Sequence, residues 1–196
     1  MLATIKRSWH ADRKAANVAI VVDVSGSMHD QDKLRQAQDG LRVFLRQFSP
    51  RDRVGLVTFA DVSRVIVPIA EMRTNRVTLE SSVEQLVAGG GTAVYDATSQ
   101  AFDLVASLDD STRINAVVVL TDGEDNQSGR NVESLLAELR RRDESDVGSI
   151  RVFTIAYGDG ANKDVLASIA AASGGKDYSG DPAEIAGVYR QISSFF

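Results

Sequence analysis

Aspartate, serine and threonine side chains gather where apolar runs of this 196-residue chain end. The segment VAIVVDVSGSMHD (18–30) leaves its apolar run at Asp23 and then presents Ser25 and Ser27 at alternate positions. Asp122 comes directly after a second apolar run, INAVVVLT, and Thr92 stands in the glycine-rich turn AGGGTAVYD. Carboxylate and hydroxyl oxygens suit a hard cation such as Mg²⁺, which takes six oxygens at about 2.1 Å and usually keeps several waters.

The composition of this residue set excludes the softer metals. The chain has no cysteine, and the only histidine near these segments is His29, so the set is not of the zinc or copper type. The sequence predicts a divalent-cation site, with Mg²⁺ as the first candidate and Mn²⁺ or Ca²⁺ acceptable to the same oxygens. Its members would be Asp23, Ser25, Ser27, Thr92 and Asp122.

The charge of the site indicates how it could be used. Two carboxylates roughly neutralise a divalent ion and relieve their mutual repulsion by binding it, whereas the hydroxyls add no charge. A carboxylate that acts through water leaves the ion electrophilic. An open coordination position would then accept a Glu or Asp carboxylate from a partner protein.

The elements that must position these residues alternate along the chain. Near-continuous Val and Ile runs at 17–26, 114–123 and 150–160 are typical of strands buried on both faces, and 53–60 is similar. The run 63–70 follows after two residues, which predicts an antiparallel hairpin, and Pro68 favours an edge strand.

Most of these predicted strands are followed by a segment whose apolar residues recur at helical spacing. Val77, Leu79, Val83 and Leu86 form the predicted apolar stripe of one helix. A short strand is predicted at 176–179. The predicted helices are 33–48, 75–87, 93–108, 131–144, 163–175 and 182–196.

This alternation predicts an α/β fold: a doubly wound, mostly parallel central sheet with one antiparallel edge strand and helices on both faces. Ligands of such sheets bind at the carboxyl ends of the strands, where the candidate residues lie. Residues 1–16 do not join the alternation and are predicted to be an N-terminal extension or linker, with Trp9 packing on a single domain of residues 17–196.

Bulk properties limit the partners. The formal net charge of −5 argues against nonspecific nucleic-acid binding. No apolar run approaches the eighteen or so residues of a membrane span, so direct membrane insertion is not expected. The first residues lack the apolar core of a signal peptide.

The motifs resemble those of the von Willebrand factor type A family, and the resemblance covers roughly residues 17–196. DVSGSM matches its Asp-x-Ser-x-Ser motif, and GGGTAVYDA and LTDGEDN match its other two signature elements, in the same order. The resemblance implies a Rossmann-like fold and a metal-ion-dependent adhesion site. It further implies Ser25, Ser27 and Thr92 as direct ligands, with Asp23 and Asp122 largely water-mediated and a partner's Glu or Asp in the sixth position.

The LTDG and GGGT elements look most like those of bacterial members, which occur in both the envelope and the cytoplasm. Of the two, we expect the envelope, and we expect the domain to be part of a longer multidomain protein. The resemblance implies an adhesion-type interaction module rather than an enzyme.

Two alternatives use the same residues. The first is a magnesium-dependent phosphohydrolase, which would need a carboxylate nucleophile and an acid or base. Its commonest arrangement has a second Asp where Ser25 stands, and no lysine is expected near these strand ends to neutralise a phosphoryl group. The second is a scaffold domain whose metal is purely structural.

Neighbouring residues have simpler interpretations. Gly89–Gly91 are followed by no Lys-Ser/Thr pair and so predict a turn that presents Thr92, not a phosphate loop. Glu124, Asp125 and Asn126 are expected to be solvated loop residues.

Overall fold

The computed structural model describes residues 14–143, 149–181 and 184–195. Its centre is a six-stranded sheet in the order β3-β2-β1-β4-β5-β6. Neighbouring strands are parallel except for the antiparallel β2–β3 pair, which confirms the predicted fold class and places β3, with Pro68, at one edge. The strands are β1 (Ala16–Asp23), β2 (Arg53–Phe59), β3 (Ser63–Glu71), β4 (Ile114–Thr121), β5 (Ile150–Tyr157) and β6 (Asp177–Gly180).

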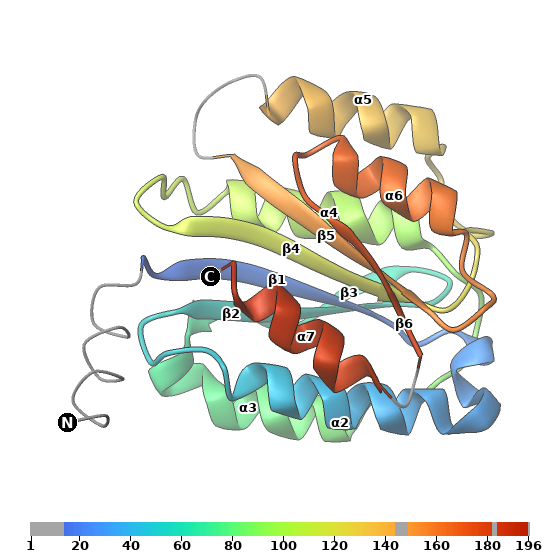
Figure 1. The fold of residues 1–196 in the computed structure, drawn as a ribbon, viewed down its shortest axis with the longest axis horizontal. Helices are drawn as coiled ribbons and strands as arrows, with labels where there is room; N and C mark the ends of the chain where they lie inside the picture. The colour runs from blue at the N-terminus through green and yellow to red at the C-terminus, as the bar shows by residue number, and fades with distance from the viewer. Residues whose placement is uncertain (1–13, 144–148, 182–183, 196) are drawn as a thin grey trace.

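Helices cover both faces of the sheet. In Figure 1, α2, α3 and α7 lie on one side of it, and α4, α5 and α6 lie on the other. A 3-10 helix, η1 (Gly26–Asp32), connects β1 to α2 and was not predicted. The α-helices are α2 (Lys33–Leu45), α3 (Met72–Glu84), α4 (Val94–Ala106), α5 (Val132–Asp143), α6 (Lys163–Ala171) and α7 (Ile185–Ser193).

The central strand β1 shows why its sequence is a continuous apolar run. All eight of its residues are buried. Val18, Ile20 and Val22 belong to the core under α2 and α7, whereas Ala19 and Val21 belong to the core under α4 and α6. A strand covered on both faces needs apolar side chains at successive positions, not at alternate ones.

The helix α3 differs from its prediction. It begins at Met72, where the Met72 N–H donates to the carbonyl of Asp52 at 2.8 Å, three residues before the predicted start. Its buried side chains are Met72, Leu79 and Val83. Val77 was wrongly placed on the apolar stripe: its side chain is 77% exposed, because it lies about half a turn from Leu79.

Some predictions fall on residues outside the described ranges. These are the packing of Trp9, most of the proposed N-terminal extension, and the predicted start of the last helix at Pro182. Within the described residues, β1 begins at Ala16. No helix in the described part of the chain has the length and apolar character that crossing a membrane requires.

Candidate metal centre

The candidate residues meet at the carboxyl ends of β1 and β4. These two strands are neighbours, while β2 continues the sheet on one side and β5 on the other, so this is the point where the strand order reverses. Asp23 is the last residue of β1, and Asp122 follows the last residue of β4. Thr92 lies in the turn that leads into α4.

Asp23 is fully buried and is held by both carboxylate oxygens. Oδ1 accepts a hydrogen bond from the Ser25 N–H at 2.7 Å, and Oδ2 accepts one from the Thr121 hydroxyl at 2.6 Å. Burial raises the pKa of Asp23 to about 6, with a smaller contribution from the nearby Asp122, although the hydrogen bonds oppose this rise. The hydrogen bonds therefore orient the carboxylate but do not fully offset the cost of burying its negative charge. A nearby cation would stabilise the ionised form of such a group.

The hydroxyls and Asp122 form a connected group beside Asp23. Ser25 Oγ lies 3.1 Å from Ser27 Oγ, and the Ser27 hydroxyl donates to Asp122 Oδ1 at 2.6 Å. A Cβ atom added to Gly123 would lie 3.4 Å from Thr92 Oγ1 and 3.9 Å from Ser27 Oγ, so both hydroxyls face the same backbone position. The five predicted residues are thus brought together from three separate segments.

The turn that carries Thr92 is fixed by backbone contacts to the segment that follows β1, and the Ala93 N–H donates to the carbonyl of Ala60, just after β2, at 2.9 Å. The Gly89 N–H donates to the Val24 carbonyl at 2.8 Å, and the Gly26 N–H donates to the Gly90 carbonyl at 2.9 Å. Gly90 has φ +88°, a left-handed conformation that favours glycine. The turn therefore presents Thr92, as predicted.

Asp125 and Asn126 do more than extend a solvated loop, although Asn126 is exposed as predicted. The Thr92 N–H donates to Asn126 Oδ1 at 2.9 Å, and the Tyr95 N–H donates to Asp125 Oδ2 at 3.1 Å. The loop after β4 therefore holds both the Thr92 turn and the first turn of α4. No local pattern predicts these contacts, since they join residues 30 or more positions apart.

Lys33 corrects a second prediction, that no lysine lies near these strand ends. Its Nζ lies 2.6 Å from Asp122 Oδ2, and its side chain is only 13% exposed. One signal could have found it: the helix after the first strand of a parallel sheet starts at the carboxyl edge, and Lys33 opens that helix.

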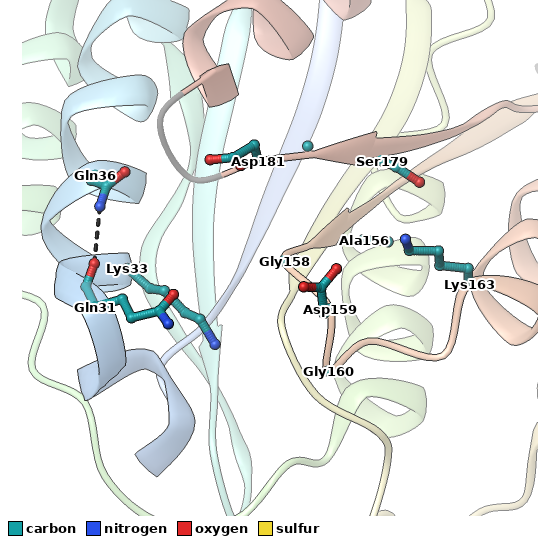
Figure 2. Close-up of a pocket in the computed structure, with 11 residues that line it drawn as sticks. Gln31, Lys33, Gln36, Ala156, Gly158, Asp159, Gly160, Lys163, Ser179 and Asp181 are labelled. Carbon is teal, nitrogen blue, oxygen red and sulfur yellow. Dashed lines mark hydrogen bonds between the residues drawn. The ribbon is translucent and has the colours of Figure 1, made fainter.

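An open pocket of about 490 Å³ adjoins this centre, and Lys33 belongs to its lining (Figure 2). Figure 2 shows Lys33 extending from α2 toward the segment that carries Gly158, Asp159 and Gly160. Lys163, at the start of α6, and Asp181 also line the pocket. Its walls therefore combine both signs of charge.

The residues fit a hard divalent cation. The described part of the chain has no cluster of three or more His, Cys, Asp or Glu side chains suited to a metal. The candidate set instead pairs two carboxylates with three hydroxyls. The 3.1 Å between the Ser25 and Ser27 hydroxyls matches the spacing of about 3 Å between adjacent ligands in an octahedron with bonds of about 2.1 Å.

The family follows from comparison with known proteins. The model of the von Willebrand factor type A (VWA) domain matches residues 17–184. The chain belongs to this family. VWA domains are commonly metal-dependent protein-interaction modules.

The relatives of this VWA domain are mostly longer proteins. An uncharacterised protein of Synechocystis sp. is 30% identical over 190 residues, which are 95% of this chain and 43% of that protein. Calcium-activated chloride channel regulator 1 of Bos taurus is 29% identical over 157 residues, covering 76% of this chain and 16% of the regulator. The chain therefore spans less than half the length of these relatives.

Solved structures share the fold. A von Willebrand factor type A protein from Catenulispora acidiphila has a TM-score of 0.75 and 25% identity, over 92% of this chain and 42% of that one. Proximal thread matrix protein 1 from the mussel byssus has a TM-score of 0.76 and 18% identity, over 93% of this chain and 46% of that one. The structure of the mussel protein is described as having a zinc-occupied MIDAS motif, the metal-ion-dependent adhesion site.

Proposed function

We propose that this VWA domain binds a divalent cation and, through it, a carboxylate of a partner protein. Ser25, Ser27 and Thr92 would hold the ion directly, with Asp23 and Asp122 acting largely through water. The observation that carries the proposal is that the Ser25 and Ser27 hydroxyls lie 3.1 Å apart beside the buried carboxylates of Asp23 and Asp122. The Thr92 hydroxyl faces the adjoining Gly123 backbone. Mg²⁺ is the first candidate, with Mn²⁺ or Ca²⁺ as alternatives.

The bound ion would supply an electrophile for a Glu or Asp side chain of the partner. The protein's own residues orient its ligands. Thr121 fixes Asp23, Asp23 fixes the Ser25 backbone, and Asp122 accepts from Ser27. Such outer contacts hold metal ligands in place and strengthen binding.

The charge of the ligand set supports protein binding as the use of this ion. The two carboxylates together balance a divalent cation, and the three hydroxyls contribute none of the further negative charge that would close the site electrostatically. An anionic ligand from outside is therefore attracted to the remaining position.

A phosphohydrolase fits the site less well. Lys33 removes one objection, since a lysine does lie at these strand ends, but its ammonium is bonded to Asp122. Ser25 still stands where the commonest phosphohydrolase arrangement has its second aspartate, so Asp23 could serve as a nucleophile but the neighbouring acid or base is missing. We therefore propose a binding module and not an enzyme.

The test is a thermal melt of the purified domain with Mg²⁺, with Mn²⁺ and with EDTA. An ion present at a hundred times its Kd should stabilise the folded state by about 2.7 kcal/mol. For a domain of this size, that corresponds to a rise in melting temperature of about 5–10 °C. An acidic peptide should then bind in the presence of the ion and be released by EDTA.

Three variants make the test specific. Asp23→Ala and Ser27→Ala should abolish the metal-dependent shift and peptide binding. Ser27 is less buried than Asp23, which makes it the gentler substitution. Asp39→Ala removes an exposed carboxylate on α2 that pairs with Arg42, and it should behave as wild type. A metal response that survived both site substitutions would overturn the proposal, and a metal shift without peptide binding would indicate a purely structural ion.

A further inference from the structure

Lys33 gives the candidate metal centre a positive charge of its own. Its Nζ lies 2.6 Å from Asp122 Oδ2, and the Asp122 side chain is fully buried. The other oxygen, Oδ1, accepts the Ser27 hydroxyl at 2.6 Å. Asp122 therefore shares its carboxylate between the hydroxyl side of the centre and an ammonium group.

The backbone holds this lysine in place. Gln31 and Asp32, directly before it, have φ values of 52° and 57°, a left-handed conformation that non-glycine residues adopt at a cost. The Tyr157 hydroxyl donates to the Lys33 carbonyl at 2.8 Å, which anchors the start of α2 to the end of β5. The ammonium thus lies at a fixed point on a mostly buried side chain, unlike a lysine on an open surface.

The charges of the centre then sum differently from those of its five ligands alone. Asp23 and Asp122 contribute −2 and Lys33 contributes +1, so a divalent ion leaves the centre with a net charge of +1. Without Lys33 the loaded centre would be neutral. Other charged groups around the pocket, among them Glu124, Asp159, Lys163 and Asp181, are exposed to solvent, which screens them.

We infer that Lys33 couples metal binding to carboxylate binding at this centre. The inference rests on the proposed function. The ammonium repels the divalent ion and so lowers the affinity of the centre for the ion alone. It also leaves the loaded centre with a net positive charge, which one carboxylate from outside neutralises. Ion and carboxylate therefore bind cooperatively, and by linkage each increases the affinity of the other by the same factor.

The experiment is calorimetric titration of Mn²⁺ into wild type, Lys33→Met and Arg35→Met. Each protein is titrated in excess acetate and in chloride of equal ionic strength. Methionine keeps the length of the lysine stem without its charge. Arg35 is a matched control on the same helix, since its exposed ion pair with Asp32 points to solvent.

In chloride, Lys33→Met should bind Mn²⁺ about tenfold more tightly than wild type, because the substitution removes a fixed positive charge beside Asp122 that repels the divalent ion. Acetate should raise the Mn²⁺ affinity of wild type and of Arg35→Met by the same factor. That factor should fall at least about fivefold in Lys33→Met, by the same electrostatic reasoning.

A structural readout accompanies the titration. Without metal, Lys33→Met should melt below wild type, because two neighbouring buried carboxylates lose their counter-charge. Saturating Mn²⁺ should restore most of that loss. Lys33→Gln serves as a second variant that removes the charge and keeps a hydrogen-bond donor.

The outcomes separate the two proposals. Unchanged or weaker Mn²⁺ binding in Lys33→Met and Lys33→Gln, with an acetate factor equal to that of wild type, would overturn the coupling and leave the metal site standing. Absence of Mn²⁺ binding by wild type itself would overturn the proposed function, and the coupling with it.

Discussion

Thr121→Val is a nearly isosteric change that tests how Asp23 is held. The Thr121 hydroxyl is fully buried at the end of β4, and it donates to Asp23 Oδ2 at 2.6 Å, a length typical of a bond to a charged carboxylate. Losing such a bond to a buried charge costs about 2 kcal/mol. The melting temperature of the EDTA-treated domain should fall by about 4–8 °C at pH 8, where Asp23 is ionised.

The same substitution should also weaken Mn²⁺ binding by about 10- to 100-fold, since Asp23 loses a contact that orients it. Thr154→Val is the matched control. Its buried hydroxyl donates at 3.0 Å to the uncharged Leu166 carbonyl, far from the centre. It should cost about 1 kcal/mol and leave Mn²⁺ affinity unchanged. Equal melting losses in the two variants, with equal Mn²⁺ affinities by calorimetry, would show that the Thr121 hydroxyl does not hold Asp23 for metal binding.

Three further predictions concern the surroundings of the centre. Asn126→Ala removes the acceptor of the Thr92 N–H, so calorimetry should show about tenfold weaker Mn²⁺ binding; an unchanged affinity would contradict this. Gly160→Ala would place Cβ 2.6 Å from the Asp122 carbonyl and should lower the urea-unfolding free energy by about 1–3 kcal/mol; a loss within about 0.5 kcal/mol would count against that contact. In EDTA, the raised pKa of Asp23, about 6, means that the folded state keeps a proton that the unfolded state releases from about pH 4. Stability should therefore fall by about 2 kcal/mol as pH rises from 4 to 6, relative to Asp23→Asn; parallel urea-unfolding profiles for the two proteins would disprove this.

Much of the fold could be predicted because burial on two faces leaves a strong local pattern. The continuous Val and Ile runs of β1, β4 and β5 cannot be satisfied by a half-exposed strand, and the sheet buries them as expected. The two-residue link between runs 53–60 and 63–70 likewise predicted the antiparallel pair of β2 and β3 at the edge of the sheet. Because parallel strands end at the same edge of a sheet, the predicted strand ends also brought Asp23 and Asp122 to the carboxyl edge.

The contacts that position the ligands were beyond local pattern. Asn126 reaches Thr92 and Lys33 reaches Asp122 only because the sheet brings distant segments together. Polar residues in loops have no periodicity that marks which of them turn inward. The prediction that Val77 is buried was wrong for a related reason. Val77 was assigned to the core because it is apolar, but the packing of Met72 and Leu79 decides which face of α3 is buried.

In the proposed function, hydroxyls of two segments bind one divalent ion. A crystal of the domain soaked in Mn²⁺, with anomalous differences measured near the manganese edge, tests it most directly. We expect a single strong peak within bonding distance of the hydroxyls of Ser25, Ser27 and Thr92, absent in Ser27→Ala crystals. No peak at that position, or a peak that persists unchanged in Ser27→Ala, would contradict it.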